Sequence, residues 1–268
     1  MHWRLYYMNA ELSSVAVFFD IEGTLTHEGR PIAGAVEVLR MVRDSGANIR
    51  FLTNITGRMP QTIAEELRTC GIPAKDDEIF TAASACAAYV RLRNLDTVRL
   101  IIPEEISSLF IGLKEDRYHP SAVIIGDVAE QFDFKLLDDI FRQIDEGSEL
   151  IAMSRNLFWF NKGRKQLDAG TFVSALELAT GREAIVCGKP SELIYSMAVK
   201  SLKNPGCRIL VVGDDIKTDI AGASQAGLEA VLVGTGKFRD QDRFRVPYAD
   251  FLPTVADLPD LLTKKLML

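Results

Sequence analysis

Short apolar runs that alternate with segments of helical period constrain the fold of this chain more than any other feature. The runs have the continuous apolar character of strands that are buried on both faces of a sheet. They cover Val15–Phe19, Ile49–Leu52, Arg208–Val212 and Glu229–Val233. Amphipathic segments separate them, and a strand–helix–strand order implies parallel strands joined by right-handed crossovers. The sequence therefore predicts an α/β fold with a doubly wound, Rossmann-like parallel sheet.

The middle of the chain has its own set of predicted strands and helices. Strands are predicted at residues 98–102, 122–125, 150–153 and 157–160, and helices at 133–144 and 172–179. The first of these helices carries apolar residues at i, i+3 and i+4 spacing along one face, so this stretch can form a small α/β layer of its own. We interpret residues 82–185 as an inserted domain that divides one core domain into residues 1–81 and 186–268.

Four polar clusters follow apolar runs at the points where the predicted strands end. They are Asp20-Ile21-Glu22-Gly23-Thr24, Thr53-Asn54, Gly188-Lys189-Pro190, and Gly213-Asp214-Asp215 together with Asp219. The carboxyl ends of parallel strands share one edge, where open α/β sheets bind their ligands, so we expect these clusters to converge. Carboxylates suit Mg²⁺, whereas a lysine, hydroxyls and backbone N–H groups suit phosphate oxygens. The combination indicates phosphoryl transfer.

Charge and cysteine content narrow the classes of function. The 268 residues carry a net charge of −6, whereas a nucleic-acid binder would need a basic stripe. A phosphate can still bind an acidic protein through N–H groups and one lysine. Three His and four scattered Cys, none in a C-x-x-C pair, argue against a zinc site and favour a reducing compartment. No apolar run reaches the roughly 18–20 residues of a membrane span. We therefore expect a cytoplasmic protein with neither a nucleic-acid nor a membrane partner.

The order of the clusters resembles that of the haloacid dehalogenase (HAD) superfamily of phosphohydrolases. That superfamily has a D-x-D-G-T-like element first, a T-N turn second, a lysine third and a G-D-D-x-x-x-D run last. The insertion between the second and third elements resembles the C2-type cap of the NagD and 4-nitrophenylphosphatase subclass, IIA. The tail from Gly213 onward resembles the phospholysine phosphohistidine inorganic pyrophosphate phosphatase branch, and the whole resemblance covers about residues 15–265.

The resemblance implies a Mg²⁺-dependent phosphohydrolase with an aspartyl-phosphate intermediate. Asp20 would be the nucleophile and would also bind Mg²⁺, together with the backbone carbonyl of Glu22 and the carboxylate of Asp214. Asp215 or Asp219 would orient metal-bound water or the lysine from behind the metal ligands. Either aspartate could instead simply cap the helix that begins near residue 218.

The phosphoryl group would be held by the remaining clusters. The hydroxyl of Thr53 and the N–H of Asn54 would bind its oxygens, and Lys189 would neutralise its charge. The substrate would be a small phosphorylated molecule, over which the inserted domain closes to exclude water and read the leaving group. A homodimer through the inserted domain is expected by analogy with the subclass.

Glu22 departs from the superfamily, most of which has an aspartate general acid/base there. The longer side chain would have to fold back to reach a leaving oxygen, and general acid/base catalysis contributes about 10²–10⁴-fold. We therefore predict a preference for activated phosphates, namely aryl phosphates, phosphoramidates or pyrophosphate. Whether Glu22 acts as acid/base or offers only its carbonyl stays open. The alternative is a catalytically weak or silent module that binds phosphate or a phosphoprotein.

Overall fold

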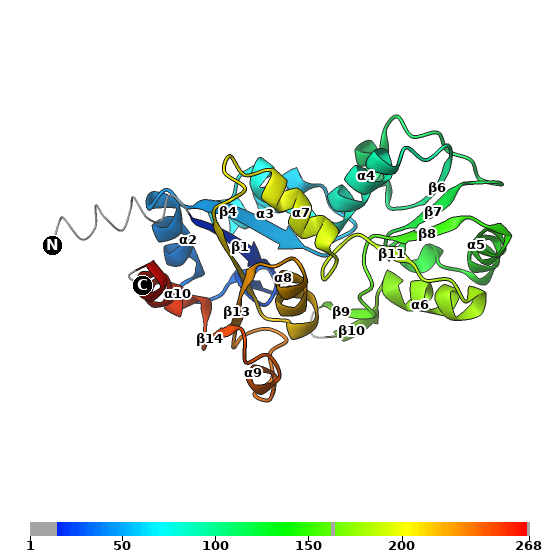
Figure 1. Cartoon of the computed structure of the whole chain (residues 1–268). Coiled ribbons are helices and arrows are strands. Elements are labelled where there is room, and N and C mark those ends of the chain that lie inside the picture. The colour runs from blue at the N-terminus through cyan, green and yellow to red at the C-terminus, as the bar shows by residue number, and fades with distance from the viewer. Residues whose placement is uncertain (1–14, 162–163, 267–268) are drawn as a thin grey trace. The chain divides into compact units, whose positions relative to one another are not determined.

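The computed structural model describes residues 15–161 and 164–266, which separate into two compact units (Figure 1). The first unit consists of the described residues up to Thr53, of Pro60–Phe80, and of those from Tyr195 onward. The second consists of Asn54–Met59 and Thr81–Ile194. Residues 54–59, 81 and 186–194, which the sequence predicts to lie in the core domain, therefore group with the second unit. The boundaries at 81/82 and 185/186 stay a prediction.

A six-stranded sheet forms the centre of the first unit. Its order is β14 (Asp250–Leu252), β13 (Glu229–Val233), β12 (Arg208–Gly213), β1 (Val15–Asp20), β4 (Asn48–Thr53) and β5 (Ile79–Thr81). The pairs from β14 to β4 are all parallel, and β1 is buried along its whole length because it lies between β12 and β4. The predicted doubly wound parallel sheet is confirmed.

Amphipathic helices cover this sheet. They and the shorter helical turns of the unit are α2 (Ala35–Asp44), α3 (Pro60–Thr69), η1 (Asp76–Glu78), α7 (Glu192–Lys200, from Tyr195 on), η4 (Ile216–Ile220), α8 (Ala221–Gln225), α9 (Asp242–Arg245), η5 (Val255–Asp257) and α10 (Leu258–Leu266). Helix α2 buries Ala35, Val38, Leu39 and Val42 as one stripe, which is the helical spacing of a core-facing side. A short hairpin of β2 (Thr26–His27) and β3 (Arg30–Pro31) follows β1.

The second unit has its own parallel sheet, in the order β11 (Ile185–Val186), β8 (Glu149–Ala152), β7 (Ala122–Ile125) and β6 (Val98–Ile101). Figure 1 shows α5 (Phe134–Glu146) and α6 (Ala169–Thr180) side by side along it, and their apolar faces share one core with β7. A hairpin of β9 (Phe158–Asn161) and β10 (Arg164–Leu167), helix α4 (Ala82–Arg93), η2 (Glu104–Phe110) and η3 (Ala129–Gln131) complete the unit. The predicted α/β layer is confirmed. No helix in the described ranges is long and apolar enough to span a bilayer.

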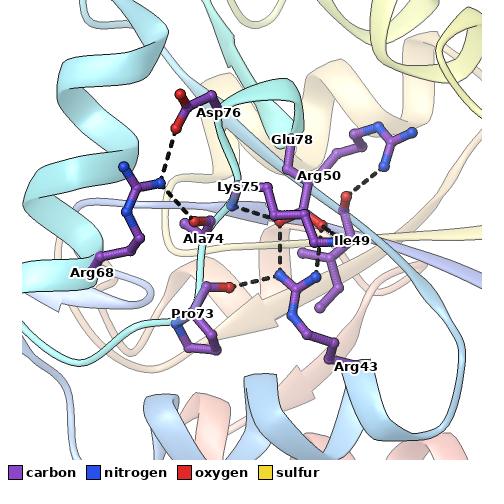
Figure 2. A network of polar contacts seen from close by, with 9 residues as sticks. All are labelled: Arg43, Ile49, Arg50, Arg68, Pro73, Ala74, Lys75, Asp76 and Glu78. Atoms are coloured by element: carbon purple, nitrogen blue, oxygen red, sulfur yellow. Dashed lines mark hydrogen bonds and ion pairs between the residues drawn. The ribbon is translucent and has the colours of Figure 1, made fainter.

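An ion pair between half-buried Arg43 and buried Glu78 joins α2 to the loop before β5 (Figure 2). Arg43 donates from Nη1 to Glu78 Oε1 at 2.8 Å and from Nη2 to Glu78 Oε2 at 2.7 Å. The same Nη2 donates to the carbonyl of Pro73, and the N–H of Lys75 donates to Glu78. These hydrogen bonds to Glu78 raise the pKa of Arg43. The loop, which contains little secondary structure, is thereby held against the helix.

A second charged network ties α10 to the amino ends of β12–β14. Glu229 accepts hydrogen bonds from Arg208 and from Lys265, and Lys265 also pairs with Asp250 at 2.7 Å. The bonds from Arg208, followed by those from Lys265, lower the pKa of Glu229 to about 2.

We expect this network to be an acid-sensitive contribution to stability. Because the folded-state pKa of Glu229 is depressed, its contribution is present above its ordinary pKa of 4.5 and is lost as the pH falls toward 2. Glu229→Gln should lower the free energy of unfolding by about 1 kcal/mol at pH 7, since the partly exposed carboxylate is screened by solvent. Urea unfolding of both proteins should show this difference shrinking toward zero near pH 2–3. A difference that is the same at pH 7 and pH 3 would contradict the assignment.

Candidate active site

Three buried carboxylates gather at the carboxyl edge of the first unit's sheet. Asp20 is the last residue of β1, Asp214 directly follows β12, and Asp219 lies on the turn η4. One oxygen of each lies within 4.8 Å of the others. Burial, and then the charges of Asp20 and Asp219, raise the pKa of Asp214 well above its ordinary range. A nearby cation favours the charged form of carboxylates that lie this close together.

Two glycines allow the backbone to approach Asp214 closely. Gly23 and Gly236 have φ values of +94° and +60°, and a Cβ on either would overlap the carboxylate of Asp214. Thr235 donates its hydroxyl to the carbonyl of Gly23 at 2.5 Å, which joins the loop after β1 to the loop after β13. Only residues without a side chain can line this carboxylate at that distance.

Asp215 and Asp219 are only four positions apart in the sequence, but their carboxylates have different neighbours. Asp215 caps the turn η4, because its carboxylate accepts the N–H of Lys217 at 2.8 Å. Asp219 is buried against the backbone of Gly213, where a Cβ would overlap it, and it accepts the N–H of Asp215 at 3.1 Å. The structure therefore brings Asp219, rather than Asp215, into the carboxylate cluster.

Lys237 is a charged neighbour of the cluster that the sequence analysis missed. Its N–H donates to Asp214 Oδ2 at 2.6 Å, and its ammonium lies 3.3 Å from Asp215 Oδ2. Partial burial, the largest influence, lowers the pKa of Lys237, but the carboxylates of Asp215, Asp214, Asp20 and Asp219 together hold it above its ordinary value. A signal was present in the sequence: Lys237 follows the strand Glu229–Val233 by a few residues, as the other polar clusters follow theirs.

The remaining predicted residues fall into both units. Thr53 ends β4 and is buried one residue beyond Leu52, the register partner of Asp20. In the second unit, Asn54 and Lys189 form a reciprocal pair: the N–H of Lys189 donates to Asn54 Oδ1 at 2.7 Å, and Asn54 Nδ2 donates to the carbonyl of Lys189 at 2.9 Å. Gly188 permits this approach, since a Cβ there would lie 2.6 Å from Asn54 Oδ1. The side chain of Asn54 thus positions the lysine segment.

Glu22 folds back onto its own loop. Its carboxylate accepts the hydroxyl of Thr26 at 3.0 Å and the N–H of Glu28 at 2.8 Å, and His27 Nδ1 lies 3.7 Å away. The side chain is 57% exposed. The carboxylate therefore closes the turn between β2 and β3, and its role as general acid/base stays a prediction.

The carboxylate cluster fits a hard divalent cation. Asp20, Asp214 and Asp219 supply oxygen ligands alone, which is the donor set that Mg²⁺ or Ca²⁺ takes. A bound cation would relieve the mutual repulsion of these three carboxylates. In the described ranges these are the only three or more His, Cys, Asp or Glu residues grouped closely enough to hold a metal ion.

Fold and site together define a doubly wound α/β protein with a carboxylate cluster at the carboxyl edge of its sheet. A dinucleotide-binding protein would have a glycine-rich turn after its first strand, whereas this chain has the carboxylate of Asp20. Residues 17–113 match the haloacid dehalogenase-like hydrolase family, and residues 186–261 match the HAD-hydrolase-like family. The chain belongs to the haloacid dehalogenase-like hydrolases, which confirms the resemblance drawn from the sequence.

Known relatives span nearly the whole chain. Haloacid dehalogenase-like hydrolase domain-containing protein 2 of Bos taurus is 33% identical over 88% of this chain and 90% of its own length. Phospholysine phosphohistidine inorganic pyrophosphate phosphatase of Danio rerio is 31% identical over 80% of this chain and 79% of its own length. The crystal structure of a 4-nitrophenylphosphatase from Thermotoga maritima has the same fold, with a TM-score of 0.84 at 23% identity, over 93% of this chain and 98% of that one.

Proposed function

We propose that this chain is a Mg²⁺-dependent phosphohydrolase that acts on small phosphorylated molecules through an aspartyl-phosphate on Asp20. The observation that carries the proposal is the burial of Asp20 beside Asp214 and Asp219 at the carboxyl edge of the sheet. A lone capping aspartate would need no such neighbours. Membership of a hydrolase family with phosphatases among its relatives supports the same reaction class.

The proposed reaction begins at Asp20. A carboxylate oxygen of Asp20 attacks phosphorus, the bond from phosphorus to the leaving group breaks, and the leaving group departs with that electron pair. Water then attacks the phosphorus of the aspartyl-phosphate, the bond from phosphorus to the Asp20 oxygen breaks, and inorganic phosphate and the free carboxylate result; the proton lost by the water neutralises the departed leaving group. A cation held by Asp20, Asp214, Asp219 and the carbonyl of Glu22 would offset the negative charge that separates nucleophile from substrate.

The other predicted residues keep supporting roles in the proposal. The hydroxyl of Thr53, at the end of the strand beside Asp20, binds a phosphoryl oxygen, as does the N–H of Asn54. Lys189 neutralises the phosphoryl charge, and the hydrogen bonds of Asn54 to its backbone support that role. Asp215 caps η4 and pairs with Lys237, so it orients the turn η4 and the ammonium of Lys237 from behind the metal ligands. Residues 82–185 act as the cap that reads the leaving group.

A direct assay separates this enzyme from a silent phosphate-binding module. Purified protein is incubated with 4-nitrophenyl phosphate, with Mg²⁺ or with excess EDTA, and phosphate release is followed. We expect turnover that needs Mg²⁺ and returns when Mg²⁺ is restored. Phosphate binding in calorimetry without any turnover would favour the binding module. A panel of alkyl phosphates, phosphoramidates and pyrophosphate then defines the leaving group.

We expect Glu22 to contribute little to hydrolysis of activated phosphates. Its carboxylate accepts hydrogen bonds from Thr26 and Glu28, which it would have to give up to reach a leaving oxygen. Glu22→Gln should change kcat/KM for 4-nitrophenyl phosphate by less than about threefold, whereas loss of a general acid costs about 10²–10⁴-fold. Glu22→Asp should raise kcat/KM for an alkyl phosphate more than it raises kcat/KM for the aryl phosphate. Equal gains on both substrates, or a hundredfold loss in Glu22→Gln, would contradict this.

Location and assembly are further parts of the proposal. We propose a cytoplasmic enzyme, which agrees with four cysteines that are all free thiols. We also propose a homodimer formed through residues 82–185. Its oligomeric state is measured by light scattering at several concentrations.

A further inference from the structure

Tyr195 lies behind the turn that carries Asp219. Among the described residues it is the largest fully buried side chain, and it belongs to α7. Its hydroxyl donates to the carbonyl oxygens of Thr218, at 3.1 Å, and of Asp219, at 3.2 Å. Its ring packs on Gly222, where a Cβ would lie 2.6 Å from Cε2. A tyrosine hydroxyl has thus been placed against the backbone of the residue that completes the carboxylate cluster.

The turn itself is unusual. The segment Ile216–Ile220 is a π-helix, in which the N–H of Ala221 bonds to the carbonyl of Ile216, five residues back. Such single π-turns are rare and frequently lie at functional sites. The sequence predicts an ordinary helix that begins near residue 218, whereas the structure has a π-turn over Ile216–Ile220.

The turn is held from two sides. On the inner side, Asp219 rests on Gly213 and accepts the N–H of Asp215 at 3.1 Å. On the outer side, Tyr195 binds the carbonyls of residues 218 and 219. A shift of either contact would move the Asp219 carboxylate relative to Asp20 and Asp214, to which its oxygen lies within 4.8 Å.

We propose that Tyr195 is a positioning residue, whose hydroxyl holds the π-turn so that the Asp219 carboxylate stays beside Asp20 and Asp214 and the cluster binds Mg²⁺ tightly. The proposal rests on the metal site of the proposed function and adds a residue that does not touch the metal. Groups that orient metal ligands typically change metal affinity about 10–100-fold when they are removed.

Calorimetric titration of the metal-free protein with Mg²⁺ tests this without reference to activity. Tyr195→Phe removes one oxygen and should weaken Mg²⁺ binding about tenfold. Gly222→Ala, which displaces the ring from the other side, should weaken it as well. Tyr89→Phe is the matched control, because the hydroxyl of Tyr89 is a surface acceptor for Arg93 and should not affect Mg²⁺.

Two further variants distinguish positioning from a general loss of stability. Leu262→Ala opens a cavity in α10, so it should lower the melting temperature while leaving Mg²⁺ affinity unchanged. Adding Tyr195→Phe to Asp219→Asn should weaken binding by less than about twofold beyond Asp219→Asn alone, because the two residues act in series.

The outcomes separate the two proposals. If the wild-type protein binds no Mg²⁺, the metal site of the proposed function is wrong and this inference falls with it. If the wild-type protein binds Mg²⁺ and Tyr195→Phe binds it equally well, only the role of Tyr195 is overturned. A loss of affinity in Leu262→Ala as large as that in Tyr195→Phe overturns it too.

Discussion

Replacing Asp20 with asparagine is expected to lower Mg²⁺-dependent hydrolysis of 4-nitrophenyl phosphate by about 10³-fold or more. Removal of a nucleophile that forms a covalent intermediate leaves only binding and electrostatic contributions to catalysis. Asparagine keeps the size of the side chain but offers a neutral amide, which does not attack phosphorus and lacks the negative charge of the carboxylate. The measurement is kcat in steady-state assays, with circular dichroism to show that the variant is folded.

Asp76→Asn provides the control for this change. Asp76 is half-exposed and pairs with Arg68, away from the carboxylate cluster. The activity of the Asp76→Asn variant should therefore equal that of the wild type within about twofold. Wild-type activity in Asp20→Asn would overturn the assignment of the nucleophile. If the wild-type protein binds Mg²⁺ tightly but shows no turnover, the carboxylate cluster is a cation-binding site without catalytic activity.

The largest expected effect on stability comes from Arg43. Arg43→Met leaves the carboxylate of Glu78, whose side chain is only 8% exposed, without its bidentate partner. Breaking a buried pair costs about 3 kcal/mol, which for a chain of this length is a fall in Tm of roughly 6–12 °C. Thermal and urea unfolding measure it directly.

Arg68→Met is the matched control in the same region (Figure 2). Arg68 pairs with Asp76, but both side chains are about half exposed, so the loss should stay below about 1 kcal/mol. In the double variant Arg43→Met/Glu78→Met the buried charge disappears as well, and the cost should be smaller than in Arg43→Met alone. Equal destabilisation by Arg43→Met and Arg68→Met would show that burial of the pair does not matter.

Strands and helices with a clear apolar pattern were predictable from the sequence. Val15–Asp20 and Phe134–Glu146 have the predicted identity, because an all-apolar run and a 3.6-residue apolar stripe each satisfy one kind of secondary structure. Helix α4 has no such apolar stripe, because its alanines are spread around the helix. The hairpin strands β2 and β3 have only two residues each and carry no period at all.

The carboxylate cluster was predictable in part for the same reason. Asp20 and Asp214 follow parallel strands that lie side by side, so their meeting follows from sheet topology. The place of Asp219 depends on the π-turn, and that of Lys237 on a loop that crosses to Asp214. Both depend on contacts with residues distant in the sequence, which no local pattern contains.

The order of strands, helices and strand-end carboxylates was determined by the sequence itself, since apolar periodicity and the shared edge of parallel strands are properties of short segments. Only the tertiary structure decided where each charge points. Glu22 binds its own hairpin and Asp219 joins the cluster through Gly213 and Tyr195. A side chain takes the direction in which its hydrogen bonds are satisfied, and those partners are brought to it by the folded chain.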